Sequence, residues 1–136
     1  MAFVMDASVT MAWCFEDEAT PYTESVLERL RVEEAEVPAI WSLEVANVLL
    51  VAERRRRLTE SQTVRFTEIL LALPVNVDTE AKERCLGPIL SLGREFALSA
   101  YDAAYLELAA RRGLALATCD EGLKSAAAQM GVPLLS

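Results

Sequence analysis

Short apolar runs alternate along this chain with longer segments of helical periodicity, and this alternation restricts the fold more than any other feature. The runs that we predict to be strands span 2–5, 36–38, 75–77, 114–118 and 132–134. The segments that we predict to be helices span 8–15, 40–57, 60–73, 99–112 and 121–130, with further helices beginning at 21 and near 79. Because such alternation produces a parallel sheet with helices on both faces, we expect an α/β fold. The 136 residues fit a single domain, 1–136.

Capping and helix-breaking residues indicate where several helices begin or end. Thr59 and Gln62 have the spacing of a capping box, so a helix should begin directly after Thr59. Asp78 or Thr79 is expected to cap the helix that follows the strand 75–77. The Gly-Pro pair at 87–88 should kink or break that helix.

The chain contains no histidine, which limits the chemistry available to it. Ser–His and Cys–His catalysis and every histidine-containing zinc site are thereby excluded. The three cysteines, Cys14, Cys85 and Cys119, lack the spacing of metal ligands. Chemistry in this chain would therefore depend on carboxylates, whose oxygens favour hard cations such as Mg²⁺ or Mn²⁺.

Charge and hydropathy indicate where the protein acts. No uncharged apolar stretch approaches the roughly 18 residues of a membrane span, and the first basic residue is Arg29, so the positive start of a signal peptide is missing. An odd number of cysteines without such a signal favours free thiols and a cytoplasmic location. The net charge of −8 argues against a protein that coats nucleic acid, although a local basic groove stays possible.

Two of the five aspartates directly follow predicted parallel strands. Asp6 ends the run 2–5, and Asp120 follows the run 114–118. Ligands of open parallel sheets bind outside the carboxyl ends of the strands, so these two side chains should lie at the same edge. The alternative is that each aspartate caps the helix that follows it.

Two further acids occupy unusual positions on predicted helices. Glu44 has Ile40, Trp41 and Val48 among its helical neighbours, so its carboxylate would lie near the sheet or at its edge and need a cation; the alternative is a solvated carboxylate. Asp102 lies in the first turn of the helix 99–112, where it could also complete a capping box with Ser99. Four carboxylates that converge would repel one another strongly, and a divalent cation would relieve this repulsion.

Four motifs carry a resemblance to a known family. They are V-M-D-A-S at 4–8, S-L-E-V-A-N at 42–47, L-S-A-Y-D-A-A-Y-L at 98–106 and A-T-C-D-E-G-L at 117–123. In order and spacing they resemble the PIN domain, and more closely the toxin ribonucleases of VapBC toxin–antitoxin pairs. This resemblance covers the whole chain, and the motif at 98–106 is its most specific part.

The resemblance implies a fold, an activity and a site. The fold would be a three-layer α/β/α sandwich around a mainly parallel sheet. The activity would be that of an Mg²⁺- or Mn²⁺-dependent endoribonuclease, the toxin of a type II toxin–antitoxin pair, with RNA as substrate, a cognate antitoxin as partner and a homodimer as assembly. The residues that would hold the metal are Asp6, Glu44, Asp102 and Asp120, and those that would support them are Ser8, Asn47 and Thr118.

An arginine run at 54–57 ends the helix that carries Glu44. We expect Arg54, Arg55 and Arg56 to contact RNA or the antitoxin; the alternative is that they only stabilise the helix C-terminus. Glu44 and Arg54 are ten residues apart, or about 15 Å along a helix, which places the run outside the chemistry itself.

Two other functions remain open at this point. One is a non-catalytic PIN-like module that only binds a protein partner, which the full set of four acids argues against. The other is an Mg²⁺-binding phospho-acceptor domain of the signalling type. That function needs an acceptor aspartate with a lysine partner, and the only candidates are Asp78 and Lys124.

Overall fold

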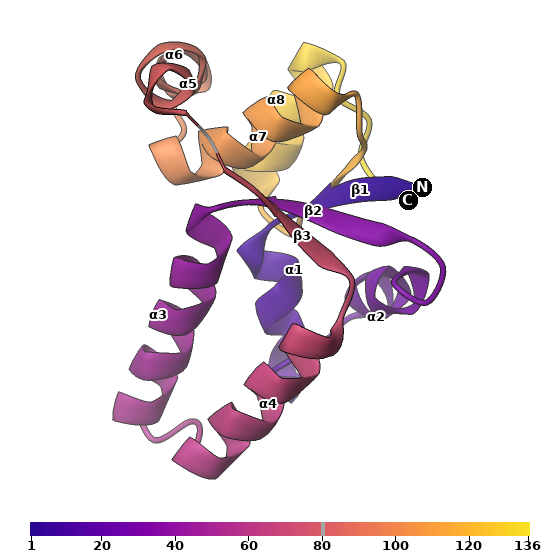
Figure 1. The fold of residues 1–136 in the computed structure, drawn as a ribbon, viewed down its shortest axis with the longest axis vertical. Coiled ribbons are helices and arrows are strands. Elements are labelled where there is room, and N and C mark those ends of the chain that lie inside the picture. Colours follow the sequence, from indigo (N-terminus) through magenta and orange to yellow (C-terminus); the bar gives the residue numbers. More distant parts are fainter. Residues whose placement is uncertain (80) are drawn as a thin grey trace.

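The computed structural model describes residues 1–79 and 81–136 and contains a four-stranded parallel sheet (Figure 1). The strand order is β3-β2-β1-β4. The strands are β1 (Ala2–Met5), β2 (Glu34–Pro38), β3 (Val75–Asp78) and β4 (Leu116–Ala117). The register pairs Val4 of β1 with Glu36 on one side and with Leu116 on the other. All strands are parallel, so their carboxyl ends lie along one edge of the sheet.

Helices cover both faces of the sheet, which confirms the predicted α/β/α arrangement. In Figure 1, α1 to α4 lie below the sheet and α5 to α8 lie above it. The helices are α1 (Ala7–Ala12), α2 (Pro21–Arg29), α3 (Ile40–Arg54), α4 (Glu60–Ala72), α5 (Lys82–Arg84), α6 (Leu90–Phe96), α7 (Ala100–Arg112) and α8 (Glu121–Met130). A short 3₁₀ turn, η1 (Glu16–Glu18), precedes α2, and a π-helical turn, η2 (Cys85–Ile89), joins α5 to α6.

The hydrophobic core lies around the central strand β1. Phe3, Val4 and Met5 are completely buried because helices cover both faces of this strand. This burial explains why the run at 2–5 is continuously apolar rather than alternating. Below the sheet, the Trp41 indole donates a hydrogen bond of 3.0 Å to the Thr10 hydroxyl and so joins α3 to α1.

Most predicted helix ends are confirmed. Thr59 and Gln62 form the expected capping box at the start of α4. The Gly-Pro pair interrupts the helix as expected, since Pro88 lies within the π-helical turn. The capping prediction for Asp78 or Thr79 is wrong, because Ala81 precedes α5 and Asp78 ends β3. The Asp78 carboxylate instead accepts a hydrogen bond from Arg111 at 2.7 Å.

Four predicted elements are shorter in the structure than the sequence suggested. The predicted helix 8–15 ends at Ala12. Helix α3 ends at Arg54, because Arg56 adopts a left-handed backbone with a φ of +59°. The predicted strand 114–118 is reduced to Leu116–Ala117. The run 132–134 forms a single bridge between Leu134 and Leu116.

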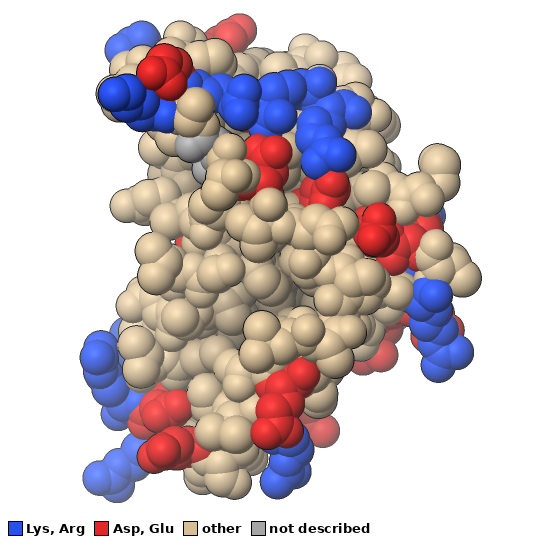
Figure 2. All heavy atoms as spheres, viewed as in Figure 1, with Lys and Arg blue, Asp and Glu red and all other residues tan. Residues whose placement is uncertain are grey.

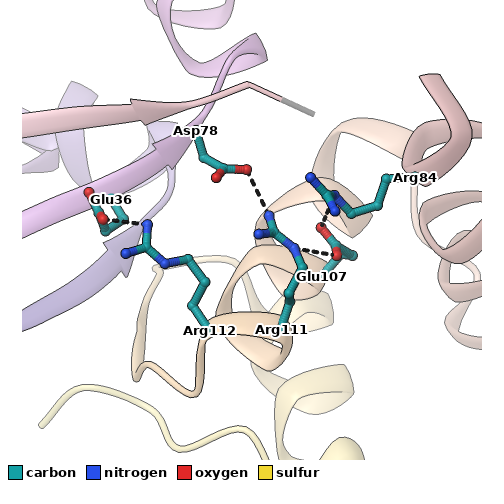
Figure 3. Close-up of polar contacts among 6 residues, drawn as sticks. All are labelled: Glu36, Asp78, Arg84, Glu107, Arg111 and Arg112. Carbon is teal, nitrogen blue, oxygen red and sulfur yellow. Dashed lines mark hydrogen bonds and ion pairs between the residues drawn. The ribbon is translucent and has the colours of Figure 1, made fainter. Parts of the chain in front are cut away.

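Buried acids and arginines meet above the sheet in a group that we call the ion-pair cluster (Figure 3). Its members are Glu36, Asp78, Arg84, Glu107, Arg111 and Arg112. Arg111 on α7 bridges Glu107 at 2.9 Å and Asp78 at 2.7 Å, while Arg112 pairs with Glu36 on β2. The cluster therefore connects α7 to β2 and β3. Arg84 of α5 lies 3.7 Å from Glu107, so α5 is connected to α7 as well.

Within the part of the chain that the structure describes, no helix is long and apolar enough to cross a membrane.

Candidate metal centre

Asp6 lies at the carboxyl end of β1 and is only 4% exposed. One of its oxygens accepts hydrogen bonds from the Ser8 hydroxyl at 2.6 Å and from the Val9 amide at 3.2 Å. The Thr118 hydroxyl donates to its other oxygen. Asp6 therefore caps α1, as the alternative prediction proposed. Burial raises its pKa, although the three hydrogen bonds oppose this shift.

Asp120 follows β4 and caps α8. Its carboxylate accepts hydrogen bonds from the amides of Gly122 at 2.8 Å and Leu123 at 3.3 Å. The Thr118 hydroxyl accepts a hydrogen bond from the Asp120 amide at 3.0 Å while it donates to Asp6. Thr118 thus joins the two aspartates directly, and both lie at the same edge of the sheet as predicted.

Glu44 reaches this edge from the second turn of α3. Its Oε1 accepts a hydrogen bond of 2.6 Å from the hydroxyl of Tyr105 on α7. Burial raises the pKa of Glu44, and the negative charges of Asp102 and Asp6 raise it further. The carboxylate is therefore close enough to both aspartates to be affected by their charge.

Asp102 completes the group from the first turn of α7. The Ser99 hydroxyl caps this helix by accepting a hydrogen bond of 3.1 Å from the Asp102 amide. Burial raises the pKa of Asp102, and the charge of Asp120 raises it further. The structure thus brings the four predicted acids together, and we call Asp6, Glu44, Asp102 and Asp120 the acidic centre.

The acidic centre has no positively charged partner in the described part of the chain. Among residues 1–79 and 81–136, no ion pair joins any of these four acids to a lysine or arginine. A carboxylate that is buried without a cation, as Asp6 is, is costly, and four carboxylates with no nitrogen or sulfur ligand match the oxygen chemistry of Mg²⁺ or Mn²⁺. The donor set therefore fits a divalent cation.

The side chains of the acidic centre do not form a complete set of metal ligands in this conformation. In the described part of the chain, no group of three or more acidic, cysteine or histidine side chains is arranged so that it could hold a metal ion. Three of the four carboxylates are instead engaged by donors of the chain itself: Asp6 by hydroxyls, Glu44 by a phenol and Asp120 by backbone amides. An ionised carboxylate has about four acceptor sites, so these hydrogen bonds do not use all of its oxygen lone pairs, and the metal site stays a prediction.

The other predicted residues divide into two groups. Ser8 and Thr118 contact Asp6 as expected, and the Ser8 hydroxyl also accepts from the amide of Cys119 at 3.0 Å. Asn47, by contrast, is exposed and lines a pocket of about 220 Å³ with other residues of α3 and with Arg55 and Arg57, which follow the end of α3.

The arginine run separates in the same way. Arg54, Arg55 and Arg56 are exposed at the end of α3. Arg57 instead pairs with Asp17 at 3.1 Å and covers the ring of Phe15 at 4.1 Å. Only the first three arginines therefore present unpaired charge within the described residues.

The hydrogen bond from Tyr105 to Glu44 was not predicted from the sequence. A buried tyrosine hydroxyl needs a hydrogen-bond partner, and Tyr105 lies three residues after Asp102 on the same helix face. These two facts were available from the sequence, but they do not identify Glu44 as the partner.

Comparison with known proteins gives a family match over most of the chain. The family model described as "PIN domain" matches residues 3–129. No protein in the curated set matches the sequence.

Solved structures share the fold at low sequence identity. PAE2754 from Pyrobaculum aerophilum superimposes with a TM-score of 0.72 and 20% identity, covering 93% of this chain and 84% of that one. VapBC2 from Rickettsia felis, solved with a DNA fragment from its promoter, superimposes with a TM-score of 0.68 and 12% identity, covering 100% of this chain and 98% of that one. FitAcB from Neisseria gonorrhoeae superimposes with a TM-score of 0.65 and 17% identity, covering 100% of this chain and 97% of that one.

Proposed function

The chain belongs to the PIN-domain family, and from that premise we propose that it is an Mg²⁺- or Mn²⁺-dependent endoribonuclease, the toxin of a type II toxin–antitoxin pair. The observation that carries the proposal is the acidic centre: four carboxylates from separate elements lie near enough at one edge of the sheet for their charges to affect one another, and no lysine or arginine of the described chain forms an ion pair with them.

The chain's own residues would prepare this centre for a cation. When bound by Asp6, Glu44, Asp102 and Asp120, Mg²⁺ or Mn²⁺ supplies an activated water and neutralises charge at the scissile phosphate. Ser8 and Thr118 hold both oxygens of Asp6, and Thr118 also fixes the backbone at Asp120. Their contribution is orientation, because the hydroxyls contact the acid and not the substrate.

An RNA-cleavage assay tests the proposal. Purified protein is incubated with a panel of tRNA and rRNA in Mn²⁺, in Mg²⁺ or in chelator, next to the Asp102→Asn variant. We expect cleavage by the wild type with either metal, and no cleavage above background in chelator or by the variant. Cleavage that Asp102→Asn retains would assign the activity to a contaminant. A wild type that is silent with both metals would contradict the enzyme function.

RNA contact by the arginine run is part of the proposal. Arg54, Arg55 and Arg56 are exposed, and ten residues of helix separate Arg54 from Glu44, which is about 15 Å. This is a suitable distance for holding RNA a few nucleotides from the cut. Replacing Arg55 and Arg56 with Gln should lower the salt dependence of RNA binding by one or two phosphate contacts.

A protein partner is supported by an apolar groove between α3 and α4. Its volume is about 380 Å³, and its apolar lining includes Trp41, Val45, Leu49, Leu50, Leu70 and Leu71. Leu50 is 49% exposed and Leu71 is 87% exposed. Figure 2 shows this face as an uncharged hollow in the centre of the view. Such exposed apolar surface is typical of a protein interface.

We assign this groove to the antitoxin rather than to RNA. An amphipathic segment with an apolar stripe would fill it, and a lysine or arginine beside the stripe would meet Glu53 of the lining. Leu71→Asp should therefore weaken capture of the antitoxin without changing RNA cleavage. The same proposal includes a homodimer and a cytoplasmic location, the latter supported by three free thiols.

The two alternative functions receive less support. The phospho-acceptor function needs Asp78 beside Lys124, but Asp78 pairs with Arg111 and Lys124 pairs with Glu121. A non-catalytic module would have no need to keep four unpaired acids at one edge, since their repulsion opposes folding.

A further inference from the structure

The side chain of Tyr105 connects two of the helices that form the acidic centre. Its hydroxyl donates a hydrogen bond of 2.6 Å to Glu44 Oε1, from α7 to α3. Tyr105 is 1% exposed, so its ring is fixed within the core. It also follows Asp102 by three residues, which places both side chains on one face of α7. One helix therefore carries an acid of the centre and a donor to another acid of the centre.

Glu44 needs such a donor because nothing else holds its carboxylate. In the described residues, Tyr105 is its one side-chain hydrogen-bond partner, whereas Asp6 has two hydroxyl partners and one amide. A glutamate side chain has three rotatable bonds, and fixing them costs entropy at every binding event unless they are fixed beforehand. A phenol held rigidly in the core can fix them without contacting the ligand.

We propose that Tyr105 is a positioning residue, whose hydroxyl holds Glu44 through Oε1 in the orientation that joins it to Asp6 and Asp102 in the metal centre. This inference rests on the proposed function. Carboxylates that bind metals are commonly held by such outer hydrogen bonds, and losing one typically weakens metal affinity by about 10- to 100-fold. The competing explanation is that Glu44 only satisfies a buried tyrosine hydroxyl.

Tyr105→Phe tests this role, because it removes the hydroxyl and keeps the buried ring. The matched control for stability is Tyr22→Phe, since the Tyr22 hydroxyl also donates one hydrogen bond, of 2.9 Å, to the Leu135 carbonyl. Mn²⁺ affinity is measured by isothermal titration calorimetry on chelator-treated protein, and melting temperatures are measured in parallel. Neither readout depends on RNA cleavage.

We expect Tyr105→Phe to bind Mn²⁺ about 10- to 100-fold more weakly than the wild type, whereas Tyr22→Phe is the control for melting temperature alone. Both variants should lose a similar, small amount of melting temperature. In a Glu44→Gln background, Tyr105→Phe should cause no further loss of Mn²⁺ affinity, because the hydroxyl acts only through the Glu44 carboxylate.

Three results would overturn the role of Tyr105. The first is an unchanged or tighter Mn²⁺ affinity in Tyr105→Phe. The second is an equal loss of affinity with and without the Glu44→Gln change. The third is a fall in melting temperature far beyond that of Tyr22→Phe, which would make the hydroxyl structural. A wild type that binds no Mn²⁺ would instead overturn the proposed function, and the titration of the wild type alone separates that failure from the others.

Discussion

Two groups of acids in this protein, each with at least one buried member, have opposite electrostatic surroundings. In the ion-pair cluster, Glu36 and Glu107 are 6% and 5% exposed, and each has an arginine within 3 Å (Figure 3). In the acidic centre, Asp6 is 4% exposed and has only hydroxyl and amide donors. The two groups lie in the same small domain, and α7 contributes to both.

This difference distinguishes acids that stabilise the fold from acids that form a candidate ligand site. Burying a carboxylate is costly, and the ion-pair cluster offsets that cost with arginines from the chain itself. In the acidic centre no arginine or lysine of the described residues offsets that cost, so we expect the metal-free protein to be less stable than one in which these acids are paired. Retained repulsion of this kind is typical of a site arranged for a ligand that carries the missing charge.

The largest expected effect comes from breaking the ion-pair cluster. Arg111→Met would leave Glu107 and Asp78 without their shared arginine. We expect the free energy of unfolding to fall by about 2 kcal/mol, below the range for buried pairs, because the Arg111 side chain is 30% exposed and Arg84 stays 3.7 Å from Glu107. Chemical denaturation at pH 7 measures this loss.

Arg94→Met is the matched control, because exposed Arg94 has no ion pair among the described residues. It should change the free energy of unfolding by less than about 0.5 kcal/mol. Equal losses in the two variants would show that the cluster does not hold α7 on the sheet.

Removing a charge from the acidic centre should have the opposite sign. In metal-free protein, Asp102→Asn removes one of four repelling carboxylates. We expect the free energy of unfolding to rise by on the order of 1 kcal/mol, the size of one charge–charge repulsion near a protein surface. Denaturation in chelator measures the gain. A loss would mean that the favourable interaction of Asp102 with the N-terminus of α7 is larger than the repulsion.

The gain from Asp102→Asn should depend on pH. Burial raises the pKa of Asp6, Glu44 and Asp102 in the folded protein, whereas unfolded acids titrate near pH 4. A raised folded pKa gives a contribution to stability that is complete below about pH 4 and is lost as the pH rises through the folded pKa.

Wild type and Asp102→Asn should therefore have similar stability at pH 3.5 and diverge toward pH 7. Paired denaturation curves over this range, in chelator, measure the divergence. A difference that is constant with pH would show that repulsion among ionised acids is not its cause.

The smallest expected effect comes from salt. Raising the KCl concentration from about 0.1 M to 1 M shortens the screening length from about 10 Å to 3 Å. The stability difference between wild type and Asp102→Asn should shrink by a few tenths of a kcal/mol, since half-buried charges are screened only in part. A difference that grows with salt would contradict repulsion as its origin.

The sequence predicted much of the fold because the relevant signals are local. The apolar run at 2–5, the capping box at Thr59 and the Gly-Pro break at 87–88 each act within a few residues, and the structure confirms them. The ends of β4 and α3 were harder to predict from the sequence. Strand length depends on neighbouring strands, and Arg56 adopts a backbone that its residue type does not predict.

The site was predictable where an element fixes the position of a side chain. Asp6 and Asp120 follow parallel strands, so the topology alone brings them to one edge. The partners of Glu44 and Asp78 were not predictable, because Tyr105 and Arg111 are 61 and 33 residues away along the chain. Contacts at that separation depend on how α7 crosses the sheet.

The central claim is that the acidic centre is a site for a divalent cation, and thermal unfolding of wild type and Asp102→Asn, in chelator and in excess Mn²⁺, tests it most directly. We predict that the variant melts higher than the wild type in chelator. Mn²⁺ should stabilise the wild type by about 2.7 kcal/mol at one hundred times its dissociation constant, and the variant far less. Identical melting of both proteins with and without Mn²⁺ would contradict the claim.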